Sequence, residues 1–131
     1  MTPDERLARY RAEVGAIDGS EYGHVVFTNL DQPDLVVQVA TLGGQQPAVI
    51  EATPNYDGEN ARLTPAQRLA LMALGFDVTA EPYPSRPLGG HGLTEAIDLF
   101  EPTFIALGSA PDFRLGLVSA ENDHRAWADP A

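Results

Sequence analysis

Three short apolar runs joined by brief turns limit what the middle of this 131-residue chain can fold into. The runs span residues 24–29, 35–42 and 47–53, and they are rich in the β-branched residues that favour strands. Their connectors, 30–33 and 43–46, are far too short for the crossover that a parallel pair of strands requires. The runs therefore predict an antiparallel meander.

Two helix starts share one pattern. Thr2 and Thr64 each precede a proline, and each is followed three residues later by Glu5 or Gln67, which is typical of a capping box. The first helix then carries one apolar stripe, formed by Leu7, Tyr10, Val14 and Ile17. Its three cations lie off this stripe and are expected on a solvated face with intrahelical ion pairs: Arg6, Arg9 and Arg11.

The second helix is expected to end at Gly75. Its apolar stripe is predicted at Leu69, Met72 and Phe76, with further width from Leu71 and Leu74. So broad an apolar surface predicts burial on more than one side, against a sheet and against a second subunit in an oligomer.

The prolines between 77 and 87 predict an extended loop with a short strand around Val78. Thr94 is the expected cap of a third helix, whose apolar spacing continues across Pro102. That spacing fits a kinked helix or two short helices, and a strand at 104–107 is the alternative.

Residues 114–119 predict a last short strand, and the polar residues 120–131 predict a tail. The whole chain, 1–131, is expected to form a single α+β domain with its core at about 3–119. The predicted architecture is an antiparallel meander sheet of three to five strands packed with two or three helices.

Charge and composition exclude several classes of protein. Eight basic residues, all Arg, stand against 19 acidic ones, for a net charge of −11, which argues against nucleic acid or an anionic membrane as partner. The chain has no Cys, which excludes disulfides and zinc–thiolate sites, and no Lys, which excludes a Walker-type phosphate loop. No apolar run approaches the ~20 residues of a membrane span, so the expected location is the cytoplasm.

Reactive groups are few, and the most suggestive stretch is a glycine–histidine loop. Gly89, Gly90, His91 and Gly92 precede a helix start, where backbone N–H groups could hold an anion. A turn between a proline-rich loop and a helix needs no function to explain these residues, and this is the favoured interpretation. No two His residues stand at a ligand spacing, so we expect no metal, no cofactor and no catalytic residues.

An apolar patch on the sheet is a second candidate site. Its predicted members, expected to contact a client peptide or another copy of the chain, are Phe27, Val36, Ala40 and Val49. In the alternative interpretation these residues fill the core of a monomer.

The order of elements and several short motifs resemble the type III secretion chaperone-like fold, and in particular the TY-Chap domains of actinobacteria, relatives of the YbjN group. The residues that carry the resemblance are 35–40 (LVVQVA), Gly43-Gly44, Glu51, 63–67 (LTPAQ), Leu71 and 74–76 (LGF). The resemblance covers about residues 3–108, and it implies a small, often dimeric, non-enzymatic chaperone or adaptor that binds partner proteins.

Three hypotheses of function follow. The first is a protein-binding module, chaperone-like or adaptor-like, that acts through an apolar surface and forms a homodimer. The second is an acidic, immunity-type or decoy inhibitor of a basic partner, and the third is a small-ligand-binding protein or enzyme that uses the 89–92 loop. Charge-driven binding weakens sharply with salt, whereas apolar binding does not, so salt dependence separates the first two.

Overall fold

The structure is a computed structural model that describes residues 1–43, 46–54, 62–80, 83–89 and 92–121. The elements along the chain are α1 (Pro3–Ala16), β1 (His24–Asn29), β2 (Gln32–Ala40), β3 (Val49–Thr53), α2 (Pro65–Ala73), β4 (Ser85–Pro87), α3 (Leu93–Ala106) and β5 (Leu115–Glu121). The predicted α+β class and the predicted meander of the first three strands are confirmed.

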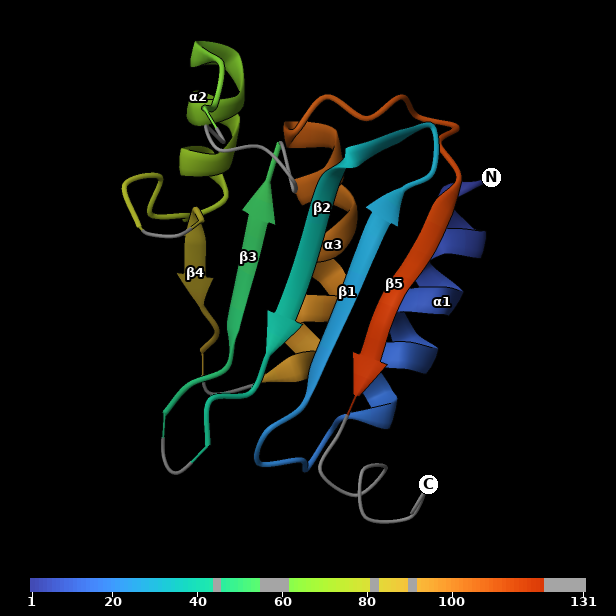
Figure 1. Ribbon diagram of the computed structural model, residues 1–131, viewed down its shortest axis with the longest axis vertical. Coiled ribbons are helices and arrows are strands. Elements are labelled where there is room, and N and C mark those ends of the chain that lie inside the picture. The colour runs from blue at the N-terminus through green and yellow to red at the C-terminus, as the bar shows by residue number, and fades with distance from the viewer. Residues whose placement is uncertain (44–45, 55–61, 81–82, 90–91, 122–131) are drawn as a thin grey trace.

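The strands form one antiparallel sheet in the order β4-β3-β2-β1-β5 (Figure 1). The last strand, predicted at 114–119, pairs with β1 and so forms one edge of the sheet. The other edge is β4, which the sequence placed differently: the expected strand around Val78 is reduced to an isolated bridge between Asp77 and Ser85. Pro84 precedes β4 and Pro87 is its last residue, and they shorten the strand because proline cannot donate to a ladder.

Helices α1 and α3 cover the same face of the sheet, and α2 lies beyond the end of β3 (Figure 1). Between the two covering helices and the sheet, the rings of Tyr10, Phe27 and Phe100 pack with centroids 5.0–5.3 Å apart. Edge-to-face and stacked pairs of this kind add to the stability gained from burial alone. This aromatic cluster is the centre of the core.

Side chains alternate across β2 as its sequence predicts. Leu35, Val37 and Val39 belong to the core under the helices. The cross-strand register places the intervening residues on the opposite face, where Val36 pairs with Thr53 and Gln38 with Glu51.

Helix starts agree with the sequence twice and disagree once. Thr2 accepts a hydrogen bond from the backbone N–H of Glu5, and the capping box at Thr64 is complete. The third helix instead begins after Gly92, which offers no side-chain cap, and the predicted cap Thr94 lies inside the helix. Pro102 lies within one helix that runs from Leu93 to Ala106, so the alternative of a strand at 104–107 is wrong.

Candidate functional site

A groove of about 630 Å³ lies between α2 and α3. The side of α2 that lines it carries alanines, and the wall on α3 and just beyond carries Pro102, Ile105, Ala106, Leu107 and Gly108. The lining contributed by α2 and its ends is Thr64, Ala66, Gln67, Ala70, Ala73 and Leu74. Small side chains let the backbone of an occupant approach closely, so the groove suits an apolar segment with larger side chains.

The polar groups at this groove are already hydrogen-bonded within the protein. Thr64 Oγ1 accepts from the N–H of Gln67 at 3.1 Å, and Gln67 Oε1 accepts from the N–H of Thr64 at 2.8 Å. Gln67 Nε2 donates to the carbonyl of Leu107 at 2.8 Å, which ties the start of α2 to the end of α3. An occupant therefore meets an apolar surface on which the polar side chains of Thr64 and Gln67 are already hydrogen-bonded.

A second attachment holds the other end of α2. Arg86 donates from Nη1 to the carbonyl of Leu74 at 2.8 Å and from Nη2 to Glu95 of α3 at 2.5 Å. Glu95 also accepts from the backbone N–H of Gly89 at 2.8 Å. The two ends of α2 are therefore pinned to opposite ends of α3, with the groove between them.

Little of α2 itself is buried. Within this helix, every residue of which the structure describes, Leu71 alone is buried, whereas Leu69 is 67% and Met72 is 53% exposed. The predicted stripe of Leu69, Met72 and Phe76 is thus wrong for its first two members. The reason is that the helix touches the body of the protein along Leu71 and the residues that follow it, because it lies at the end of the sheet rather than on its face (Figure 1).

The exposed apolar side chains extend the groove to a wider surface. Leu69 lies three residues from Ala66 and four from Ala73, which places it beside the alanine row on the helix surface. On the opposite wall Ile105 is 45% exposed. Exposed apolar residues gathered around one depression are typical of an interaction site.

The apolar patch predicted on the sheet is divided between its two faces. Phe27 is 1% exposed and packs in the core against the rings of both Tyr10 and Phe100, so its placement in an exposed patch is wrong. Val36 does lie on the face away from the helices but is only 2% exposed. These two residues follow the alternative interpretation, in which the patch is buried.

The other two members of that patch, Ala40 and Val49, are half-buried and pair with each other across β2 and β3. They share the face of Val36, as the alternation of β2 predicts. Binding through these two residues stays a prediction.

On the same face, Glu51 accepts a hydrogen bond from Gln38 Nε2 at 3.2 Å. Burial raises the pKa of Glu51, and the hydrogen bond from Gln38 opposes that shift. A cavity of about 10 Å³ lies beside the pair, lined also by Tyr83 and Thr53, which is room for about one water molecule. This is too small for a substrate.

The glycine–histidine loop is described in part. Gly90 and His91 lie outside the described residues. Gly89 donates to Glu95, and the N–H of Gly92 donates to the carbonyl of Gly89 at 3.0 Å. The two described residues of the loop thus have their N–H groups bonded within the protein, and ligand binding by the loop stays a prediction.

A buried ion pair is the feature that sequence reasoning missed. Arg6, expected on a solvated face, is fully buried and forms a salt bridge with Glu101 of α3. Its guanidinium also donates to the carbonyls of Met1, Pro111 and Phe113, and it stacks 4.1 Å from the centroid of the Phe113 ring. The prediction failed because helical spacing identifies apolar stripes but not a cation buried by partners a hundred residues away.

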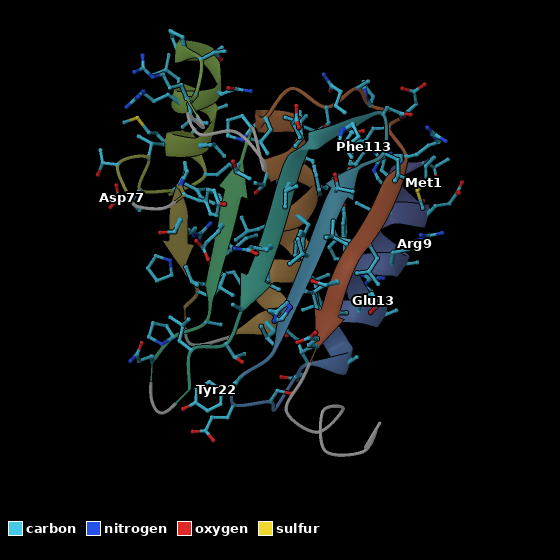
Figure 2. The ribbon with its side chains drawn as sticks, in the orientation of Figure 1. Met1, Arg9, Glu13, Tyr22, Asp77 and Phe113 are labelled. Atoms are coloured by element: carbon cyan, nitrogen blue, oxygen red, sulfur yellow. The ribbon has the colours of Figure 1, made fainter. Side chains whose placement is uncertain are left out.

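Tyr10 completes this buried cluster. Its hydroxyl donates to Glu101 Oε2 at 2.9 Å. Burial and the neighbouring carboxylate raise the pKa of Tyr10 well above its usual range, and the hydrogen bonds that Arg6 donates to Glu101 raise the pKa of Arg6. The cluster joins α1 to α3. Figure 2 shows Met1 and Phe113 near the N-terminal end of α1, with Arg9 and Glu13 further along the same helix.

Among the described residues, no three His, Asp or Glu side chains gather closely enough to hold a metal ion. In the same part of the chain, none of the helices has the length and apolar character to cross a membrane.

The fold and the groove define a small α+β protein with an open five-stranded sheet and an apolar depression between two of its helices. Comparison with protein-family models, curated proteins and solved structures finds no match. The similarity to TY-Chap domains therefore stays a prediction from the sequence.

Proposed function

We propose that this chain is a non-enzymatic protein-binding module, chaperone-like or adaptor-like, which holds an apolar segment of a partner protein in the α2–α3 groove. The observation that carries the proposal is the apolar groove itself, with exposed Leu69 and Ile105 at its margins and with satisfied polar groups. The resemblance stated above implies the same class of activity.

The chemistry of the groove favours a protein segment over a small molecule. Small-molecule sites usually carry a few polar groups that orient the ligand. The polar groups of Thr64 and Gln67 are instead hydrogen-bonded within the protein. An amphipathic helix needs only an apolar groove of suitable width for its i, i+3 and i+4 side chains.

Self-association is one form of this proposal. A two-fold dimer would place the same surface of each copy against the other. The net charge of −11 opposes such a dimer, and this opposition weakens as salt rises. Light scattering coupled to size exclusion, at low and moderate salt, measures whether a homodimer forms.

The same net charge supports a second candidate function, an acidic inhibitor or decoy that engages a basic partner in the cytoplasm. Binding of that kind should fall steeply with ionic strength, whereas binding in the apolar groove should persist at 0.5 M salt, where the Debye length is down to about 4 Å.

The test is a pair of matched substitutions. Ala70→Glu places a carboxylate in the groove, and Ala8→Glu places the same group on the exposed surface of α1. Both variants should fold, because both sites are on helix surfaces and Glu is a good helix former.

The assay is affinity capture followed by a titration of the recovered protein. We expect partner capture by the wild type and by Ala8→Glu and its loss in Ala70→Glu. Equal capture by all three proteins would show that the groove is not the binding site.

A further inference from the structure

The α3 wall of the groove is the side that carries uncompensated negative charge. Asp98 is exposed and lies one helical turn before Pro102, so the two residues share a face of α3. Pro102 lines the groove, and the Asp98 carboxylate therefore lies next to the end of the groove.

The other two acidic residues of this helix are neutralised by ion pairs. Glu95 is paired with Arg86, and Glu101 is paired with the buried Arg6. Asp98 takes part in none of the salt bridges among the described residues.

Pro102 leaves a backbone carbonyl of α3 without its donor, on the same face of the helix. An α-helical residue donates its N–H to the carbonyl four residues earlier, and proline has no N–H. The carbonyl of Asp98 thereby loses its helical donor. This carbonyl points along α3 toward Pro102, so it lies on the face of the helix that lines the groove.

The α2 wall supplies no charge that would compensate for Asp98. The cation of this helix is Arg68, which is two residues from both Ala66 and Ala70 and so lies on the side of α2 away from the groove. The groove is thus apolar along its length. At its Asp98 end the cation of Arg86, held on the Leu74 carbonyl, is already paired with Glu95, so the Asp98 carboxylate leaves this end negative.

We propose that the partner segment bound in the groove is an apolar helix with a Lys or Arg at the end that lies over Asp98. A Lys or Arg head group offers several N–H donors, enough to meet both the carboxylate and the free carbonyl, while its aliphatic stem packs on apolar walls. This inference rests on the proposed function, which supplies the groove as the binding site.

The test uses three synthetic helical peptides that share one pattern of leucines at i, i+3, i+4 and i+7 and differ only in their two end residues. The ends are Lys in the first peptide, Gln in the second and Glu in the third. Having the same residue at both ends removes any dependence on binding direction. Affinities are measured by fluorescence anisotropy at 50 mM salt.

Two protein variants localise the effect. Asp98→Asn and Asp18→Asn each remove one negative charge, so both change the net charge of the protein equally, but Asp18 lies in the turn after α1. We expect the Lys peptide to bind the wild type about fivefold more tightly than the Gln peptide, which is the upper end of the affinity gain typical of one exposed ion pair. Asp98→Asn should lose this preference, and Asp18→Asn should keep it.

The outcomes separate the inference from the function beneath it. Binding of all three peptides with equal affinity, abolished by Ala70→Glu, would keep the groove as a site and overturn the basic partner. Absence of binding by every peptide would overturn the proposed function as well. A stable dimer that Ala70→Glu dissociates would show that a second copy occupies the groove, which also overturns the inference.

Discussion

Replacing Arg6 by Met removes the charged centre that joins α1 to α3. The variant keeps an unbranched side chain of similar length, but it leaves the Glu101 carboxylate without its cation. The carbonyls of Met1, Pro111 and Phe113 also lose their donor. We expect a large loss of stability, because polar groups that remain buried without partners carry their full desolvation cost.

Removal of one partner from a buried ion pair costs about 3–5 kcal/mol. Arg6 is fully buried but the Glu101 side chain is 26% exposed, so water can solvate part of the orphaned carboxylate. The low end of the range, about 3 kcal/mol, is therefore expected. For a chain of 131 residues this corresponds to a fall in Tm of roughly 12 °C.

Urea denaturation followed by circular dichroism measures this change in the free energy of unfolding. Arg9→Met is the matched control, since Arg9 is exposed on the same helix, and it should change the free energy by less than about 0.5 kcal/mol. In the double variant Arg6→Met/Glu101→Leu no charge is left unpaired, so part of the loss should be recovered. A loss of less than about 1 kcal/mol in the free energy of unfolding of Arg6→Met would show that the Arg6–Glu101 pair does not stabilise the contact between α1 and α3.

Three further substitutions test other parts of the fold. Thr64→Ala removes the capping box of α2 and should cost about 1 kcal/mol in urea denaturation, and Thr64→Asn should restore most of it. Gly75→Ala forces a φ of +87° on a residue with a Cβ, and should cost about 1–2 kcal/mol in the same assay; a neutral result would mean that this turn relaxes. Glu51 has a raised pKa in the folded state, so the folded protein is favoured when this carboxyl is protonated. This contribution to the free energy of unfolding is fully present below the ordinary pKa of 4.5 and is lost as the pH rises through the folded pKa. Glu51→Gln should accordingly stabilise the protein at pH 7, by a few tenths to about 1 kcal/mol, and the gain should vanish below pH 4; no difference at pH 7 would contradict the burial of this carboxylate.

Local patterns in the sequence predict the elements that depend on neighbours along the chain. The capping residues Thr2 and Thr64 place two helix starts correctly, because a cap acts within three residues. The alternation around 35–40 separates the core face of β2 from the other face, because successive strand residues point to opposite sides.

Features that depend on distant partners could not be predicted in this way. The burial of Arg6 requires Glu101 and the chain around Phe113, which the fold brings together from the far end of the sequence. The placement of Phe27 under the helices, rather than in an exposed patch, depends on which face α1 and α3 cover.

The groove was also beyond local reasoning. The second helix was predicted correctly as a helix, but its apolar residues gave no information on which of them the sheet would cover. Its position beyond the end of β3 leaves Leu69 exposed and opens the depression against α3 (Figure 1).

The α2–α3 groove is the proposed binding site for an apolar partner segment. The most direct measurement is a titration of ¹⁵N-labelled protein with the Lys-ended helical peptide, followed by amide chemical shifts. We expect the largest shifts on Ala66, Ala70, Ala106 and Gly108, with Asp98 shifted at one end. Shifts confined to the sheet face around Gln38, or no shifts at saturating peptide, would contradict binding in the α2–α3 groove.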